Sequence, residues 1–122
     1  MRWTKADLAR VRSAVSLAAL CHSHPGLAGH DAREAMVRDH ALPLALHGLR
    51  SLANLGEHRA GEHDQFVAWC RSEDGRRVYP NIWEELAERT EGLAADDRKG
   101  AARLRGLVAR LEVEGLPEGW RG

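Results

Sequence analysis

The sequence predicts an all-α fold, a single domain built as a bundle of five or six helices. Apolar residues recur at helical spacing in nearly every segment of the chain. β-Branched residues, which favour strands, are scarce: the 122 residues include seven Val, one Ile and two Thr. The connections between the periodic segments are short, as in helix bundles, and a chain of this length has room for one compact domain, residues 1–122.

The first helix is expected over about residues 4–20. Thr4 stands where a side-chain oxygen caps a free backbone N–H group, and Asp7 completes a capping box three residues later. One apolar stripe follows at helical spacing, which indicates a single buried face. Its members are Leu8, Val11, Val15 and Ala18. Pro25 and Gly26 oppose continuation, so the helix is expected to end before them.

A leucine-rich central segment is expected to be helical over about residues 31–55. Asp31 and Glu34 mark its start, and Gly56 is expected to end it. Pro43 cannot donate a hydrogen bond to the carbonyl of Asp39, so it either breaks or kinks this segment. The leucines cover more than one face, which predicts that this is the most buried part of the fold. They are Leu42, Leu44, Leu46, Leu49, Leu52 and Leu55.

Two short helices are expected next, over about residues 62–72 and 82–91, with Asp74-Gly75 as a turn between them. The side chains expected to be buried are Phe66, Val67, Trp69 and Cys70 in the first helix and Ile82, Trp83 and Leu86 in the second. A last helix over about residues 96–114 is expected to begin at Asp96 or Asp97 and to end at Gly115, a typical glycine cap. Its apolar stripe consists of Leu104, Leu107, Val108 and Leu111.

The distribution of charge excludes some classes of function. Eighteen basic and eighteen acidic residues balance, which argues against a strongly cationic nucleic-acid binder and against an acidic disordered tail. Residues 1–56 carry a net charge of +3, residues 57–97 of −6 and residues 98–122 of +3. Such polarity suits head-to-tail contacts with copies of the chain or with a larger assembly. Ordinary solvated helix faces would give the same pattern.

Membrane and secreted locations are not indicated. No apolar run approaches the roughly 20 residues that cross a bilayer, and the amino-terminal residues do not resemble a signal peptide. With only Cys21 and Cys70, a disulfide framework is not expected. We therefore expect a cytoplasmic protein without a membrane partner.

Neither a metal site nor a catalytic site is expected. Six residues invite a zinc hypothesis, but they lack the paired spacing of structural or catalytic sites. They are Cys21, His22, His24, His30, His58 and His63. Phosphate-binding glycine loops, nucleophile elbows and dinucleotide fingerprints are absent from the sequence. The chain is therefore expected to have no catalytic residue, no cofactor and no small-molecule substrate, with a metal-binding helical protein as the least favoured alternative.

Basic side chains are the best candidates for contact with other molecules. Three of them lie at intervals along the central segment: Arg33, Arg38 and Arg50. Three more lie close to one side of the last helix: Lys99, Arg103 and Arg110. Cations spaced along helices can follow a phosphate backbone without reading its sequence. They can equally form surface ion pairs, which contribute little to stability.

The central segment carries a family resemblance. Residues 35–42, Ala-Met-Val-Arg-Asp-His-Ala-Leu, precede an Ala45-Leu46-x-x-Leu49-x-x-Leu52 run. This pattern resembles the middle helix of the small-subunit family of type III CRISPR effector complexes. Ala41 stands where the family has Gly, and Pro43 interrupts a helix that is continuous in the family.

The resemblance implies a non-catalytic helical subunit that packs along a ribonucleoprotein filament. Its partners would be other subunits, copies of itself and the phosphates of target RNA, with Arg38 at the motif position as the first contact. The alternative that the residues leave open is a small helical inhibitor or adaptor of the mobile-element type. Such a protein would bind one larger partner through a compact patch.

Overall fold

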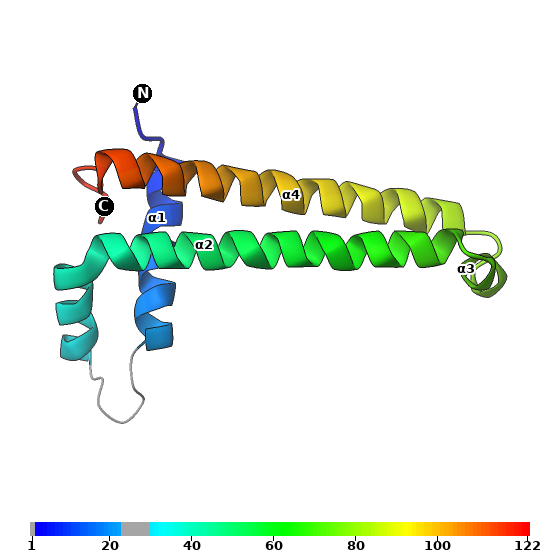
Figure 1. Cartoon of the computed structure of the whole chain (residues 1–122), viewed down its shortest axis with the longest axis horizontal. Coiled ribbons are helices and arrows are strands. Elements are labelled where there is room, and N and C mark those ends of the chain that lie inside the picture. Colours follow the sequence, from blue (N-terminus) through cyan, green and yellow to red (C-terminus); the bar gives the residue numbers. More distant parts are fainter. Residues whose placement is uncertain (1, 23–29) are drawn as a thin grey trace. The chain divides into compact units, whose positions relative to one another are not determined.

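The computed structural model describes residues 2–22 and 30–122, and these residues form helices without strands (Figure 1). The helices are α1 (Lys5–His22), α2 (His30–Arg71), α3 (Glu73–Val78) and α4 (Trp83–Glu114). The predicted all-α class is confirmed. The predicted number of five or six helices is wrong, because four helices account for the described residues.

The chain divides into two compact units, and α2 and α4 each contribute to both. The first unit comprises Met1–Leu52 and Leu104–Gly122, and it contains α1, the beginning of α2 and the end of α4. The second, which we call the hairpin unit, comprises Ala53–Arg103 and contains the rest of α2 and α4 with α3 between them.

The first unit holds the larger hydrophobic core. The predicted stripe of α1 is confirmed at Val11, Val15 and Ala18, which are buried. They pack with the α2 leucines Leu44 and Leu49 and with the end of α4. The α4 members of this cluster are Leu107, Val108 and Leu111. Thr4 caps α1 as predicted, since its Oγ1 accepts a hydrogen bond from the Asp7 N–H at 3.1 Å.

Pro43 kinks α2 instead of breaking it. The backbone of His40 leaves helical geometry, with φ of −133° and ψ of 30°, three residues before the proline. The cause is that Pro43 has no N–H to donate and that its ring clashes with the preceding turn of the helix. His40 and His47, on either side of the proline, are exposed.

Small side chains allow the helices of the first unit to approach closely. Gly48 on α2 faces the backbone of α1, and a Cβ at this position would lie 2.3 Å from the carbonyl oxygen of Ala14. No side chain fits there without a backbone shift. Glycine is therefore required at residue 48 by packing.

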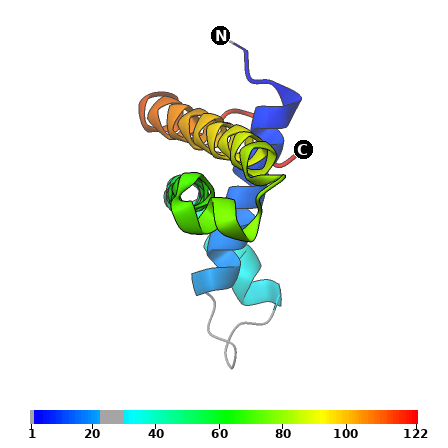
Figure 2. The same ribbon diagram turned by 90° about the vertical axis from the view of Figure 1, so that its right-hand side faces the viewer.

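The hairpin unit contains an antiparallel pair of long helices (Figures 1 and 2). The two helices pack against each other mainly through alanine side chains. Buried residues recur every seven positions on both helices, which is the pattern of a coiled coil. They are Ala53, Ala60 and Val67 on α2 and Ala87, Ala94 and Ala101 on α4. We call these six residues the alanine seam. A Cβ built on Gly56 would lie 3.3 Å from the Asp97 carbonyl oxygen, so the two backbones run close together.

The seam explains why two predicted helix ends are absent. Helix α2 continues through Gly56, and α4 continues through residues 92–97, where separate helices were expected. A glycine inside a helix costs about 1 kcal/mol relative to alanine. Burial of the seam on both sides of Gly56 offsets this cost. Ion pairs between the two helices stabilise the pair further. These pairs join Arg71 to Glu91 and Arg98 to Asp64.

Two glycine substitutions test this packing. Gly48→Ala is expected to lower the free energy of unfolding by about 1–3 kcal/mol, because the added methyl group meets the α1 backbone. Gly92→Ala is the matched control. It lies in α4 with nothing within 4 Å of an added Cβ, so it should raise the free energy by up to about 1 kcal/mol. Urea unfolding followed by far-UV circular dichroism measures both, and a neutral Gly48→Ala variant would contradict the close approach.

Candidate functional site

Three of the predicted contact arginines in the first unit are already engaged by carboxylates. Arg38 donates to its neighbour Asp39 from Nε at 3.1 Å, and both side chains are exposed. Arg50 pairs across helices with Glu112 at 3.0 Å. Arg110 pairs with Glu114 at 2.7 Å, and its guanidinium carbon lies 4.0 Å from the centre of the Trp3 ring.

The Arg38 pair is the most accessible of these. The hydrogen bond from Arg38 lowers the pKa of the Asp39 carboxyl, and the attraction of the two charges adds to this effect. Asp39 therefore remains charged and competes with any anion for the guanidinium of Arg38. The side chain of Arg38 is 71% exposed, so a phosphate could reach it from solvent.

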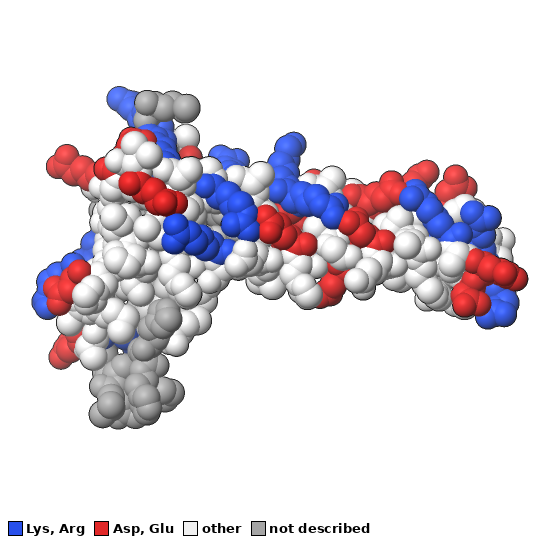
Figure 3. Space-filling model, viewed as in Figure 1, with Lys and Arg blue, Asp and Glu red and all other residues white. Residues whose placement is uncertain are grey.

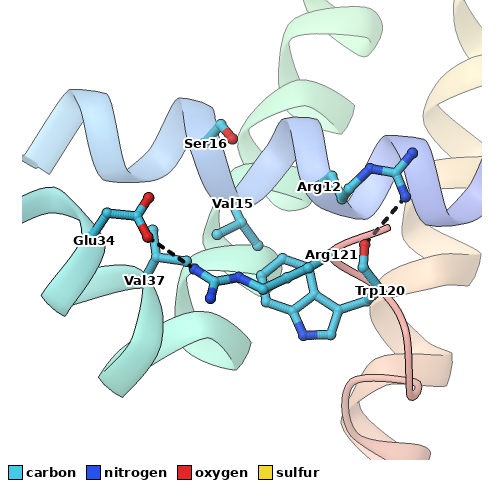
Figure 4. Close-up of a pocket in the computed structure, with 7 residues that line it drawn as sticks. All are labelled: Arg12, Val15, Ser16, Glu34, Val37, Trp120 and Arg121. Atoms are coloured by element: carbon cyan, nitrogen blue, oxygen red, sulfur yellow. Dashed lines mark hydrogen bonds and ion pairs between the residues drawn. The ribbon is translucent and has the colours of Figure 1, made fainter. Parts of the chain in front are cut away.

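Arg33 lines a pocket of about 270 Å³ between α1 and the beginning of α2, together with Leu20, Val37 and neighbouring residues. A second pocket of about 190 Å³ lies beside it and includes the carboxy-terminal segment (Figure 4). There Arg12 donates to the carbonyl oxygen of Trp120 at 3.3 Å, and Arg121 pairs with Glu34 at 3.5 Å. Both guanidinium groups thus have acceptors within the chain, and these two contacts hold the carboxy-terminal segment against α1 and α2.

The remaining two predicted contact residues belong to the hairpin unit. Lys99 and Arg103 lie on α4, and both are exposed. The six candidate cations are thus divided between the two units. Their role in binding RNA or a partner stays a prediction.

Two of the histidines have carboxylate partners. His58 Nε2 lies 2.6 Å from Glu62, and His63 Nε2 lies 3.3 Å from Asp97 across the two helices of the hairpin unit. Cys21 is exposed, and the side chains of His22, His24 and His30 lie outside the described residues. Among the side chains that are described, no three His, Cys, Asp or Glu residues come together in a way that could hold a metal ion.

The most distinctive surface of the hairpin unit is aromatic. At the end where α2 turns into α3, the rings of Phe66 and Trp69 stack with centres 6.0 Å apart. Tyr79 meets the Trp69 ring edge-on at 6.1 Å. Val78 and Ile82 flank Tyr79 and are about half exposed. We call these five residues the end patch.

The end patch is held by α3. Ser72 caps this helix, with its Oγ accepting from the Gly75 N–H at 3.3 Å. Gly75 is buried against the end of α2, and a Cβ there would lie 2.1 Å from the carbonyl oxygen of Trp69. The N–H groups of Ile82 and Trp83 then donate to the Tyr79 carbonyl, which turns the chain into α4.

Charged side chains of both signs lie at the end of the hairpin unit that carries α3 (Figure 3). Residues 62–91 include eight Asp or Glu and four Arg. Each of these arginines has a carboxylate or an aromatic ring as a partner in the hairpin unit. Arg71, Arg77 and Arg89 pair with carboxylates, and Arg76 lies 4.4 Å from the centre of the Trp83 ring.

This surface differs from the sequence prediction, in which the aromatic residues belong to the core. Val67 and Cys70 are buried as predicted, but Phe66 and Trp69 are 39% and 37% exposed, and Ile82 is 44% exposed. The signal that could have revealed this is the seven-residue spacing of the alanines. A seam of alanines buries a narrow strip, so large side chains beside it must remain outside.

Comparisons with known proteins do not identify a relative. The chain matches no protein-family model, no curated protein and no solved structure. No helix that the structure describes combines the length and the apolar character needed to span a bilayer.

Gly75→Ala tests how the end patch is held. The added methyl group would collide with the backbone of Trp69 and Cys70, so α3 is expected to shift and the contact between Trp69 and Tyr79 to be lost. The near-UV circular dichroism of the aromatic side chains should decrease while most helical signal remains. Gly100→Ala, with open space at the added Cβ, should leave the spectrum unchanged. An unchanged spectrum for Gly75→Ala would contradict the assigned packing.

Proposed function

We propose that this chain is a non-catalytic binding subunit that joins a larger assembly through the end patch. The observation that carries the proposal is the exposure of a contiguous aromatic surface on a helical hairpin. Aromatic side chains are the strongest anchors of protein interfaces, because each buries a large area with few rotatable bonds. Exposed patches of this kind mark sites of association in folded proteins.

The assembly that the sequence resemblance favours is an RNA-guided effector complex of the type III CRISPR class. In this proposal the chain acts in the cytoplasm as a small subunit. It packs against its neighbours and contacts the phosphates of target RNA through Arg38, with Arg33 and Arg50 nearby on α2 and with Lys99, Arg103 and Arg110 on α4. The exposure of Arg38 supports its place in this set.

A second candidate is an inhibitor or adaptor that binds one large partner. The compactness of the end patch favours it, because five residues at one end of a hairpin suit a single docking event better than contacts along a row. The two candidates share a binding role and differ in whether RNA takes part in the assembly.

Co-expression tests the proposal directly. The chain is produced together with the proteins encoded by the reading frames beside its gene, and the mixture is separated by size with and without ribonuclease treatment. The proposal predicts that the chain elutes with a larger complex. Sensitivity of that complex to ribonuclease supports the effector subunit, and resistance supports the adaptor. Elution of the chain alone under both conditions would contradict a binding subunit.

Substitution of Trp69 tests the role of the end patch in the complex. Trp69→Ala removes the central ring and is expected to weaken association by at least about tenfold, the size of effect typical of an aromatic anchor. Val113→Ala is the control, because Val113 is 86% exposed and lies outside the patch, in the first unit. Equal association of both variants would contradict the assignment.

A pair of neighbouring substitutions tests the RNA contact. Arg38→Gln should weaken binding of a single-stranded RNA and reduce the salt dependence of binding by about one phosphate contact. Asp39→Asn should strengthen binding, because it removes the carboxylate that now accepts from Arg38. Fluorescence anisotropy at several salt concentrations measures both. Affinities that do not respond to salt or to either substitution would contradict phosphate contact by Arg38.

A further inference from the structure

The proposed function leaves open what kind of surface the end patch binds. Its centre is apolar and aromatic, so part of any partner must be apolar as well. The charged groups that surround it decide the rest, since complementary charges select a partner and opposing charges reject one.

Each arginine near the end patch already has a partner in the hairpin unit, so a phosphate would have to compete for it. Arg71 and Arg77 are bound to Glu91 and Asp74, and Arg76 lies over the ring of Trp83. A nucleic acid or an anionic membrane would have to displace these partners. It would also meet the negative charge of the remaining carboxylates, which repels it at short range.

Several carboxylates near the patch have no such partner. Glu73 follows Trp69 by four residues, and Glu84 follows Ile82 by two. Glu88 lies one turn beyond Glu84 on α4. All three are exposed, and none forms an ion pair in the part of the chain that the structure describes. Exposed carboxylates without an ion-pair partner thus lie close in the chain to the residues of the apolar centre.

From this arrangement we infer that the end patch docks onto a partner protein whose surface has an apolar centre bordered by Lys and Arg side chains. The inference rests on the proposed binding function and names the chemistry of the partner. Apolar contact with the five patch residues provides affinity. Contact of the basic border with Glu73, Glu84 and Glu88 provides orientation and speeds association.

A synthetic helical peptide of alternating Leu and Lys faces is a probe with this chemistry. Binding of the labelled peptide to the full-length chain is followed by fluorescence anisotropy. Three comparison probes complete the set: the same peptide with Glu in place of Lys, the same peptide with Ser in place of Leu, and a single-stranded RNA. The inference predicts saturable binding of the Leu/Lys peptide and at least tenfold weaker binding of both comparison peptides.

Variants of the chain show whether binding occurs at the end patch. Trp69→Ala should weaken binding of the Leu/Lys peptide about tenfold, while Leu93→Ala, which removes an exposed apolar side chain of the same unit outside the patch, should not. The triple variant Glu73→Gln, Glu84→Gln and Glu88→Gln should weaken binding at low salt and reduce its salt dependence. Circular dichroism verifies that the variants stay helical.

Three results would overturn the inference. These are equal binding of the Leu/Lys and Leu/Glu peptides, binding unaffected by Trp69→Ala, and competition of the RNA for the end patch. Sedimentation of the chain without peptide adds a fourth, because self-association abolished by Trp69→Ala would assign the patch to a second copy. If the inference fails while Trp69→Ala still weakens the co-expressed complex, the proposed function stands and the partner's chemistry is different.

Discussion

Close contact between two long helices through alanine is the constraint on which the hairpin unit depends. The seam residues recur every seven positions on both α2 and α4, and they are buried. Because alanine fills little space, the helix axes approach until backbone atoms nearly touch, as the position of Gly56 against Asp97 shows. Such a seam holds two helices in register over several turns, yet it buries only a narrow strip of each.

The narrow seam determines what the surface looks like. Large apolar side chains beside it have no third long helix to cover them within the hairpin unit. Leu55 and Leu93 therefore remain about half exposed along the helices, and the aromatic rings gather where α3 closes the end. The first unit differs because α1 supplies a third helix, and there the leucines of α2 find a core. The same long helix thus contributes to a core in one unit and to an exposed apolar surface in the other.

Much of the fold could be predicted from sequence because local signals and packing agree. The cap at Thr4, the stripe of α1, the kink before Pro43 and the glycine at the end of α4 all follow from short-range chemistry. The predicted ends at Gly56 and Asp96 were wrong because tertiary packing prevailed over the local tendency of glycine and acidic residues to end or begin a helix.

The candidate site was harder to predict, since exposure is a property of the assembled helices. Trp69 and Phe66 are large apolar residues of the kind usually found in a core, yet both remain partly exposed beside the narrow alanine seam. The short helix α3 was also missed: its six residues contain Gly75, which reads locally as a turn but is required by contact with the Trp69 backbone. The sequence shows which residues are basic and could contact a partner. It does not show which of them pair with carboxylates, because partners such as Glu112, which binds Arg50, are distant in sequence.

A disulfide across the seam tests the close helix contact most directly. A Cβ at Gly56 would lie 3.5 Å from the Cβ of Ala101, at the short end of the range of about 3.5–4.5 Å that disulfides require. In a Cys21→Ser background, the pair Gly56→Cys and Ala101→Cys should therefore form an intramolecular bond under mild oxidation, with unchanged helical content. The pair Gly61→Cys and Ala101→Cys should not, because nothing lies within 4 Å of a Cβ at Gly61. Absence of the first cross-link, or equal formation of both, would contradict the alanine seam.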